Sequence, residues 1–446
     1  MISSKQEQHQ IKTDIGQATR TLTIDARQNS SHKITQASTV FPDASSKVPD
    51  LICLSHLRWD FVYQRPQHLL SRCAQERRVF FIEEPIFDNE STTRLDLSRR
   101  DDGVCVVVPR LPESFRDDAA RLDSAQQALI DQLIQDENIA DYILWYYTPM
   151  AMGFTRHLQP LAVVYDCMDE LSAFKNAPPA LKSREAELFR RADLVFTGGQ
   201  SLYEAKRDQH PSVYAFPSSI DTAHFMQARR INNDPDDQKN IPHPRMGYCG
   251  VIDERLDLKL IDGVAAARPE WQFVMIGPVV KIDPQSLPRR SNIHYLGGKD
   301  YKQLPAYMSG WDVALMPFAR NESTRFISPT KTPEYLAAGK PVVSTSIRDV
   351  VRPYGQQKMV HIADTVLKFV AAIEAALNED AGERFTRADA FLAQNSWNKT
   401  WARMSALIAE AVTTRRASLQ RIAANELPLR SRVAVASATS RFVTGD

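Results

Sequence analysis

The chain has 446 residues, of which 43% are hydrophobic, and its formal net charge is only +1. This length exceeds what one hydrophobic core usually serves, so we expect more than one domain. The balanced charge excludes a global field that would attract nucleic acid.

The cysteines and the apolar runs indicate the compartment. The five cysteines are scattered singly and form no zinc-binding motif, which is typical of a reducing environment. No run approaches the roughly 18 consecutive apolar residues of a membrane span, and the N-terminus lacks the apolar core of a signal peptide. We therefore expect a cytoplasmic protein.

The N-terminal half begins with a polar segment and continues as an α/β domain. Residues 1–48 are rich in Ser, Thr, Gln and Asn, which predicts a disordered arm. Over 49–230, short apolar runs alternate with amphipathic stretches, a pattern typical of a parallel sheet with crossover helices. The expected strands are 51–57, 79–84, 104–109, 142–147, 162–168, 194–199 and 213–218.

A second α/β domain follows a polar linker. Residues 231–244 are rich in Asn, Asp, Lys and Pro, which predicts an exposed hinge. The alternation of apolar runs and amphipathic stretches then returns over 245–395. The expected strands are 245–252, 271–277, 292–298, 311–318, 341–347 and 359–364. Two such domains facing one another would enclose a cleft.

The C-terminal end predicts one amphipathic helix and a basic tail. Residues 396–412 have Ser396 as the expected N-cap, followed by an apolar stripe that needs a partner. The stripe consists of Trp397, Trp401, Met404 and Ile408. The tail, 413–446, has six arginines and two acidic residues, which predicts either a loosely ordered, solvated extension or a contact with an anionic membrane surface.

The segment from Arg325 to Val343 carries the clearest chemical signal. Thr332 is the expected N-cap of a short helix, and Glu334 falls in its first turn, where the helix dipole favours a carboxylate. Such a helix start is suited to a diphosphate, and a neighbouring carboxylate can accept hydrogen bonds from two sugar hydroxyls. The alternative is that Glu334 only complements its own helix. The candidates here are Ser328, Thr330, Lys331, Thr332 and Glu334.

The same segment resembles a known signature. Pro-x-Lys-x-x-Glu-Tyr-Leu-Ala-Ala-Gly-Lys-Pro-Val-Val, from Pro329 to Val343, is similar to the sugar-donor site of the group 1 glycosyltransferases, which are retaining enzymes of the GT-B fold. The resemblance implies that Glu334 holds the nucleotide ribose and that the preceding loop and helix start hold the diphosphate. Members often have a second glutamate eight residues earlier, where this chain has Phe326.

Two other segments of the second domain extend this resemblance, which spans roughly residues 50–412. Residues 246–257 resemble the first strand and turn of the nucleotide-binding domain. There the resemblance implies that Gly250 lets a nucleotide approach the backbone and that Arg255 meets phosphate. Residues 273–278, which include Gly277, resemble the strand end beside the base.

In the first domain, residues 58–70 and 165–171 follow expected strands and resemble a bacterial subgroup linked to the assembly of cell-surface polysaccharides. The carboxyl ends of strands in open α/β sheets face the ligand crevice. The candidates are Arg65 and His68 on the acceptor side, and Asp166 and Asp169 as catalytic groups. An ordinary helix residue is the alternative for His68, and turn or cap residues are the alternative for the two aspartates.

The combined prediction is an α/β protein of two Rossmann-like domains facing a cleft, with helix 396–412 crossing back onto the first domain. We expect sugar transfer from a nucleotide diphosphate sugar to a hydroxyl of a glycan or lipid-linked acceptor. Arg255 and Lys331 would stabilise the departing diphosphate. We expect no bound cofactor and no metal, with the nucleotide sugar as co-substrate; UDP-sugar and GDP-mannose both remain open.

The sequence also bears on the partners of the protein and on alternative functions. We expect no nucleic-acid partner. If the basic tail contacts an anionic membrane surface, the protein would be peripheral at the inner face of the membrane. A nucleotide-sugar epimerase of the same fold and a nucleotide-binding homologue without turnover are the alternatives. A dinucleotide oxidoreductase is disfavoured because neither first strand is followed by Gly-x-Gly-x-x-Gly.

Overall fold

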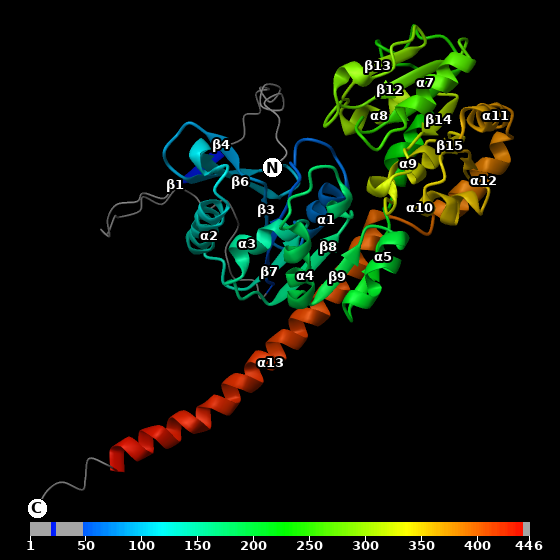
Figure 1. Cartoon of the computed structure of the whole chain (residues 1–446). Coiled ribbons are helices and arrows are strands. Elements are labelled where there is room, and N and C mark those ends of the chain that lie inside the picture. The colour runs from blue at the N-terminus through cyan, green and yellow to red at the C-terminus, as the bar shows by residue number, and fades with distance from the viewer. Residues whose placement is uncertain (1–18, 24–47, 440–446) are drawn as a thin grey trace, which may run out of the picture.

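The computed structural model describes residues 19–23 and 48–439, which form two α/β domains and a long C-terminal helix (Figure 1). The N-terminal domain has a mixed sheet with the strand order β1-β5-β6-β3-β2-β7-β8-β9-β10, and β4 pairs with β6. Its strands are β1 Thr19–Thr23, β2 Asp50–Leu54, β3 Val79–Ile82, β4 Ile86–Asp88, β5 Arg94–Arg99, β6 Cys105–Pro112, β7 Tyr142–Tyr146, β8 Ala162–Cys167, β9 Leu194–Thr197 and β10 Val213–Ala215. Its helices are α1 Arg65–Cys73, α2 Ala119–Asp136, α3 Met152–Thr155, α4 Leu181–Arg191 and α5 Gln200–Lys206. Helix α6 Thr222–Phe225, within the range expected for this domain, instead packs into the core of the C-terminal domain through Phe225.

The central strands of this sheet are parallel and wholly buried. Every residue of β2, β3, β7, β8 and β9 is buried, as expected for strands covered on both faces. Parallel pairing brings their carboxyl ends to one edge of the sheet. The loops that follow β2, β7 and β8 therefore meet at that edge.

The expected disordered arm is wrong for five residues. Thr19–Thr23 form β1, which pairs antiparallel with β5, and Arg20 makes a 3.0 Å ion pair with Glu137. The strand lies at the edge of the sheet and its sequence, Thr-Arg-Thr-Leu-Thr, is mostly polar, so it lacks the apolar run that marked the other strands. Residues 1–18 and 24–47 lie outside the described part.

The C-terminal domain has a parallel sheet with the order β13-β12-β11-β14-β15-β16. The strands are β11 Arg245–Cys249, β12 Gln272–Ile276, β13 Ile293–Gly297, β14 Val313–Met316, β15 Val342–Ser344 and β16 His361–Ile362. The helices are α7 Leu258–Ala267, α8 Leu304–Ser309, α9 Lys331–Ala337, α10 Arg348–Val350, α11 Val366–Leu377 and α12 Ala381–Leu392. A side chain at Gly247 in β11 would place its Cβ 1.9 Å from the Trp311 ring, so this strand needs glycine there.

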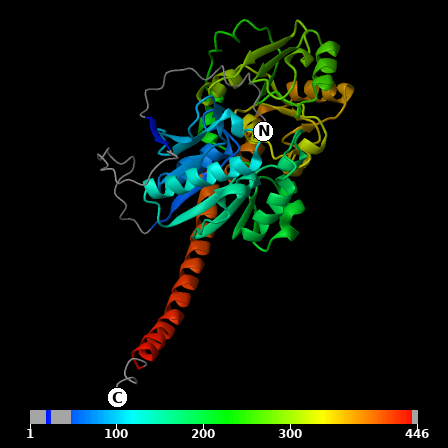
Figure 2. The same ribbon diagram turned by 60° about the vertical axis from the view of Figure 1, so that its left-hand side comes forward.

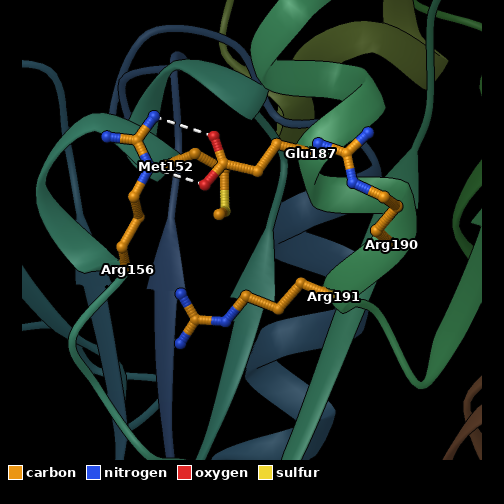
Figure 3. Close-up of a pocket in the computed structure, with 5 residues that line it drawn as sticks. All are labelled: Met152, Arg156, Glu187, Arg190 and Arg191. Atoms are coloured by element: carbon orange, nitrogen blue, oxygen red, sulfur yellow. Dashed lines mark hydrogen bonds and ion pairs between the residues drawn. The ribbon is translucent and has the colours of Figure 1, made fainter.

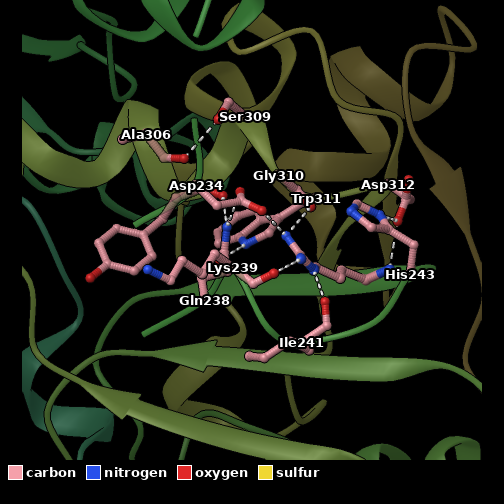
Figure 4. A network of polar contacts seen from close by, with 12 residues as sticks. Asp234, Gln238, Lys239, Ile241, His243, Ala306, Ser309, Gly310, Trp311 and Asp312 are labelled. Carbon is pink, nitrogen blue, oxygen red and sulfur yellow. Dashed lines mark hydrogen bonds and ion pairs between the residues drawn. The ribbon is translucent and has the colours of Figure 1, made fainter. Parts of the chain in front are cut away.

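The predicted hinge, residues 231–244, is anchored at its centre to the C-terminal domain (Figure 4). The Gln238 side chain has no exposed surface, and its Nε2 donates to the Tyr307 carbonyl at 2.9 Å. Its Oε1 accepts from Trp311 Nε1 at 3.1 Å, and Arg245 donates to Asp234 at 2.5 Å. Most of the linker is exposed, as expected, but these bonds anchor its centre to the C-terminal domain, so that part is packed rather than a free hinge.

The last helix, α13 Trp397–Thr439, returns to the N-terminal domain as expected. Trp397, Trp401, Met404 and Ile408 are buried in one cluster with Trp145 and other side chains of the central strands. The helix continues past residue 412, so the expected loosely ordered tail is wrong over 413–439, and this portion leaves the body of the protein (Figures 1 and 2). No helix in the described part of the chain is long and apolar enough to cross a bilayer.

Candidate active site

The two domains meet through the loops at the carboxyl ends of their sheets. The Lys175 amide donates to Glu254 Oε1 at 3.2 Å, and the Tyr63 ring stacks on Tyr301 with their centroids 4.5 Å apart. On another part of the boundary, the Ser201 amide donates to an Asp349 oxygen at 3.0 Å. Each contact joins the N-terminal domain to the C-terminal domain, so the candidate residues of the two domains face one another.

The start of α9 holds a buried ion pair. Lys331 Nζ lies 2.7 Å from Glu334 Oε2, and the Glu334 side chain is only 8% exposed. Burial opposes the charge on Lys331, but the carboxylate of Glu334 outweighs this effect and raises the pKa of Lys331. Lys331 is therefore charged at neutral pH, and a ligand that binds either side chain must replace their mutual contact.

The expected N-cap at Thr332 is wrong. Helix α9 begins at Lys331, its N-cap is Thr330, and the Thr330 side chain makes no capping bond. Thr332 has no exposed surface, and its hydroxyl donates to Met316 Sδ at 3.4 Å. Its side chain thus packs into the core, while Ser328 and Thr330 stay half-buried in the loop before the helix.

Two glycines bring the ends of β11 and β12 close to this helix. A Cβ at Gly277 would lie 1.8 Å from the Gly250 carbonyl oxygen, so the two strand ends pack backbone against backbone. A Cβ at Gly250 would lie 3.6 Å from Lys331 Cε. The structure therefore brings Gly250, Gly277, Lys331 and Glu334 together in one part of the C-terminal domain.

Arg255, in the loop after β11, is paired with a buried carboxylate. Its Nη2 lies 2.8 Å from Asp253 Oδ2, and its Nε lies 3.0 Å from Oδ1 of the same residue. Burial opposes the charge, and the bond to Asp253 reverses this effect and raises the pKa of Arg255. The guanidinium carbon also lies 6.0 Å from the centre of the Phe174 ring, which belongs to the N-terminal domain.

In the N-terminal domain, Arg65 and Asp166 form an ion pair in the interior. Arg65 Nη2 lies 2.8 Å from Asp166 Oδ1, and the two side chains are 3% and 0% exposed. Arg65 Nη1 donates to the Phe216 carbonyl at 2.8 Å. A catalytic role for Asp166 and an acceptor-side role for Arg65 do not fit this geometry, because neither side chain is accessible to a substrate. The pair instead joins the start of α1 to the end of β8.

Asp169 differs from Asp166 in having no partner. Its carboxylate makes no hydrogen bond or ion pair with any residue that the structure describes. Burial raises the pKa of Asp169 to about 6, although the positive charges of Arg255 and Arg65 act in the opposite direction. Asp169 thus feels the charge of Arg255 from the other domain, and its carboxylate can gain or lose a proton near pH 6.

His68 is a packing residue in this structure. It is 5% exposed, and its ring stacks on Trp397 with their centroids 4.6 Å apart and their planes 10° apart. Burial and then the charge of Arg72 lower its pKa to about 3. This arrangement fits the alternative of an ordinary helix residue, since the ring holds α13 against α1.

Two polar residues at this boundary, His56 and Lys281, were not predicted as site residues. His56 Nδ1 is buried without a hydrogen-bond partner, and burial followed by the charge of Lys281 lowers the pKa of His56 to about 4. His56 was assigned to the expected strand 51–57, which hid its place just beyond the end of β2. Lys281 follows Gly277 in a loop without a recognisable motif.

A separate hollow lies away from these residues. It has a volume of about 200 Å³ and lies between α3 and α4, lined by Met152, Arg156, Glu187, Arg190 and Arg191 (Figure 3). Glu187 pairs with Arg156 at 2.5 Å, and Arg191 donates to the carbonyls of Thr155 and Leu158. These groups bond to one another or to the backbone, and the hollow contains none of the candidate residues. Among the described residues, no group of His, Cys, Asp or Glu could hold a metal ion.

Comparisons with known proteins assign the C-terminal domain first. The family of glycosyl transferases group 1 matches residues 244–379, which include Gly250, Arg255, Lys331 and Glu334. A Bacillus subtilis (strain 168) protein, the putative teichuronic acid biosynthesis glycosyltransferase TuaH, is 27% identical over 281 residues, or 57% of this chain and 68% of the relative. Residues 244–379 are therefore a glycosyltransferase domain of group 1.

Solved structures agree on the fold of this glycosyltransferase. A sucrose-phosphate synthase from Thermosynechococcus elongatus has a TM-score of 0.64 and 14% identity, covering 82% of this chain and 100% of its own. An E. coli trehalose-6-phosphate protein bound with UDP-2-fluoro glucose has a TM-score of 0.59 and 14% identity, covering 81% and 99%. The predicted GT-B fold, with two Rossmann-like domains and a returning C-terminal helix, is confirmed. The prediction of an enzyme that uses a nucleotide sugar is also confirmed.

Proposed function

We propose that this glycosyltransferase moves a sugar from a nucleotide diphosphate sugar to a hydroxyl of a glycan or lipid-linked acceptor during cell-surface polysaccharide synthesis. The observation that carries the proposal is the Lys331–Glu334 pair at the start of α9, beside Gly250 and Gly277. The likeness to a protein of teichuronic acid biosynthesis supports the polysaccharide part.

Each group at the donor site has a role that follows from its chemistry. Glu334 accepts hydrogen bonds from the ribose hydroxyls, which frees Lys331 to bind a phosphate oxygen. The loop with Ser328 and Thr330 leads to the first amides of α9, whose positive dipole end favours an anion. Arg255 approaches the diphosphate from the loop after β11. The base and the sugar are those of a UDP-sugar or of GDP-mannose.

The transfer step breaks the bond between the anomeric carbon and the diphosphate oxygen, whose electron pair goes to the diphosphate. The acceptor oxygen forms the new bond to the anomeric carbon, and its proton passes to a phosphate oxygen of the leaving group. The nucleophile thus attacks from the side of the leaving group, and the configuration is retained. Arg255 and Lys331 oppose the charge that grows on the diphosphate, which is where preorganised groups contribute most.

The acceptor side of the site is formed by the N-terminal domain. Asp169 accepts a hydrogen bond from the acceptor hydroxyl and orients it, since this carboxylate has no other partner among the described residues. The reaction takes place in the cytoplasm. The arginines of the tail, which include the exposed Arg415 and Arg421, support a peripheral contact with the inner face of an anionic membrane.

A thermal-shift screen tests the donor site. Wild-type protein is melted with UDP, GDP, UDP-sugars and GDP-mannose, and a nucleotide present at about a hundred times its dissociation constant adds about 2.7 kcal/mol. Glu334→Gln should need more nucleotide for the same shift and should raise the donor KM, because ribose binding is equal in the ground and transition states. The matched control is Glu322→Gln, an exposed glutamate in the loop before α9. A wild-type response from Glu334→Gln would contradict the proposed donor site.

A further inference from the structure

Lys281 is a cation without a carboxylate partner at the boundary between the domains. It is exposed, and no carboxylate among the described residues forms an ion pair with it. Lys281 Nζ lies 5.6 Å from the centre of the Phe174 ring. The residue also has a φ of 62°, a conformation that few residues other than glycine adopt. Such a backbone persists where the surrounding structure fixes it.

The loop that carries Lys281 is joined to the loop that carries Arg255. Ile252 and Val279 form a parallel bridge beyond the ends of β11 and β12, and the Val280 amide donates to the Ile252 carbonyl at 3.1 Å. Lys281 follows two residues after this bridge, and Arg255 follows three residues after it. Both cations lie against the same Phe174 ring, at 5.6 Å and 6.0 Å, so they converge on one region.

The cations of this region differ in whether a carboxylate is paired with them. Asp253 balances Arg255, and Glu334 balances Lys331, so each of these pairs is nearly neutral as a unit. A diphosphate brings at least two negative charges into the site. Lys281 forms no ion pair with a carboxylate of the described residues, so its ammonium can bind a phosphate oxygen without breaking one, and its charge acts on both His56 and Asp169 across the boundary.

We propose that Lys281 binds the diphosphate of the sugar donor and stabilises the charge that grows on it as the sugar leaves. Its ammonium would leave the Phe174 ring, with which its contact is worth little at an exposed site, and would donate to a phosphate oxygen. The inference rests on the proposed function, because it assigns a further residue to the same donor site. It makes Lys281 a catalytic residue that shares the diphosphate with Arg255 and Lys331.

The test compares binding of phosphates with binding of nucleosides. Isothermal titration calorimetry measures UDP, GDP, uridine and guanosine with wild-type protein, Lys281→Ala and Lys281→Arg. A charged hydrogen bond of this kind corresponds to about a tenfold to hundredfold change in affinity. We expect Lys281→Ala to weaken binding of the nucleoside diphosphate by this factor, to leave nucleoside binding unchanged, and to lower kcat by about 10²–10³. Lys281→Arg should recover much of both losses.

The matched control is Lys358→Ala. Lys358 is also an exposed lysine of the C-terminal domain with a positive φ, 54°, so the control reports the effect of changing such a backbone position. If UDP or GDP binds wild type and Lys281→Ala equally and kcat is unchanged, the role of Lys281 is refuted while the proposed donor site stands. If no nucleotide binds the wild-type protein, the proposed function fails and the inference fails with it. A loss shared by Lys281→Ala and Lys358→Ala would also refute the role of Lys281.

Discussion

Asp169→Asn tests two expected properties of Asp169, which are the raised pKa of its carboxylate and its role in orienting the acceptor hydroxyl. The Asp169 carboxylate has a pKa of about 6 because burial disfavours its charged form, whereas an unfolded chain leaves an aspartate near its ordinary value of 3.8. The folded state therefore holds the proton more tightly than the unfolded state. The stabilising effect of this proton is complete below about pH 4 and is lost as the pH rises through 6.

The size of the effect follows from the pKa difference. A change from 3.8 to about 6 corresponds to about 3 kcal/mol, and this is an upper value because the Asp169 side chain is only partly buried. An asparagine does not ionise, so the variant avoids this loss. Relative to wild type, we expect Asp169→Asn to gain up to about 3 kcal/mol of folding free energy between pH 4 and pH 7. The transfer rate should fall, because the amide orients the acceptor hydroxyl less well.

The assay is denaturation by urea at pH values from 4 to 8, with wild type and variant measured side by side. Asp208→Asn is the matched control, since Asp208 is an exposed aspartate of the same domain. Only the difference between each variant and wild type is interpreted, which removes the titration of all other groups. If the difference between Asp169→Asn and wild type is the same at pH 4 and pH 7, the raised pKa of Asp169 is refuted. If transfer activity is unchanged, its role at the acceptor hydroxyl is refuted.

Three further substitutions test the remaining assignments. Lys331→Ala should lower kcat by about 10²–10³ with a smaller effect on the donor KM, measured by steady-state kinetics at saturating acceptor; equal changes in both would contradict a role in the transition state. Asp166→Asn should destabilise the protein by about 3–5 kcal/mol, because Arg65 would remain charged and buried without its partner, and wild-type stability in urea would disprove this. Trp401→Ala should cost about 3–5 kcal/mol in the same assay, whereas Trp401→Phe, which keeps an aromatic ring but loses the bond to Glu76, should cost less.

The sequence by itself determined the local elements and the core of the proposed sugar-donor site. The expected strand 142–147 is β7, Tyr142–Tyr146, because a continuous run of apolar residues can only be a buried strand or helix and this one is short. The stripe from Trp397 to Ile408 predicted a buried helix face for the same kind of reason. The motif around Glu334 placed a carboxylate and Lys331 one helical turn apart, and local helix geometry then brings them within bonding distance.

Only the tertiary structure decided which polar side chains have a hydrogen-bond or ion-pair partner. Asp166 and Asp169 are three residues apart and looked equivalent, yet Arg65, 101 residues away from Asp166, occupies the first and leaves the second without a partner. The polar linker around Gln238 looked exposed until its bonds to Tyr307 and Trp311 placed it in the domain. A residue type shows which bonds a side chain can make. Whether water or a distant part of the chain supplies the partner is determined by packing, because burial and pairing arise from contacts between segments that the sequence places far apart.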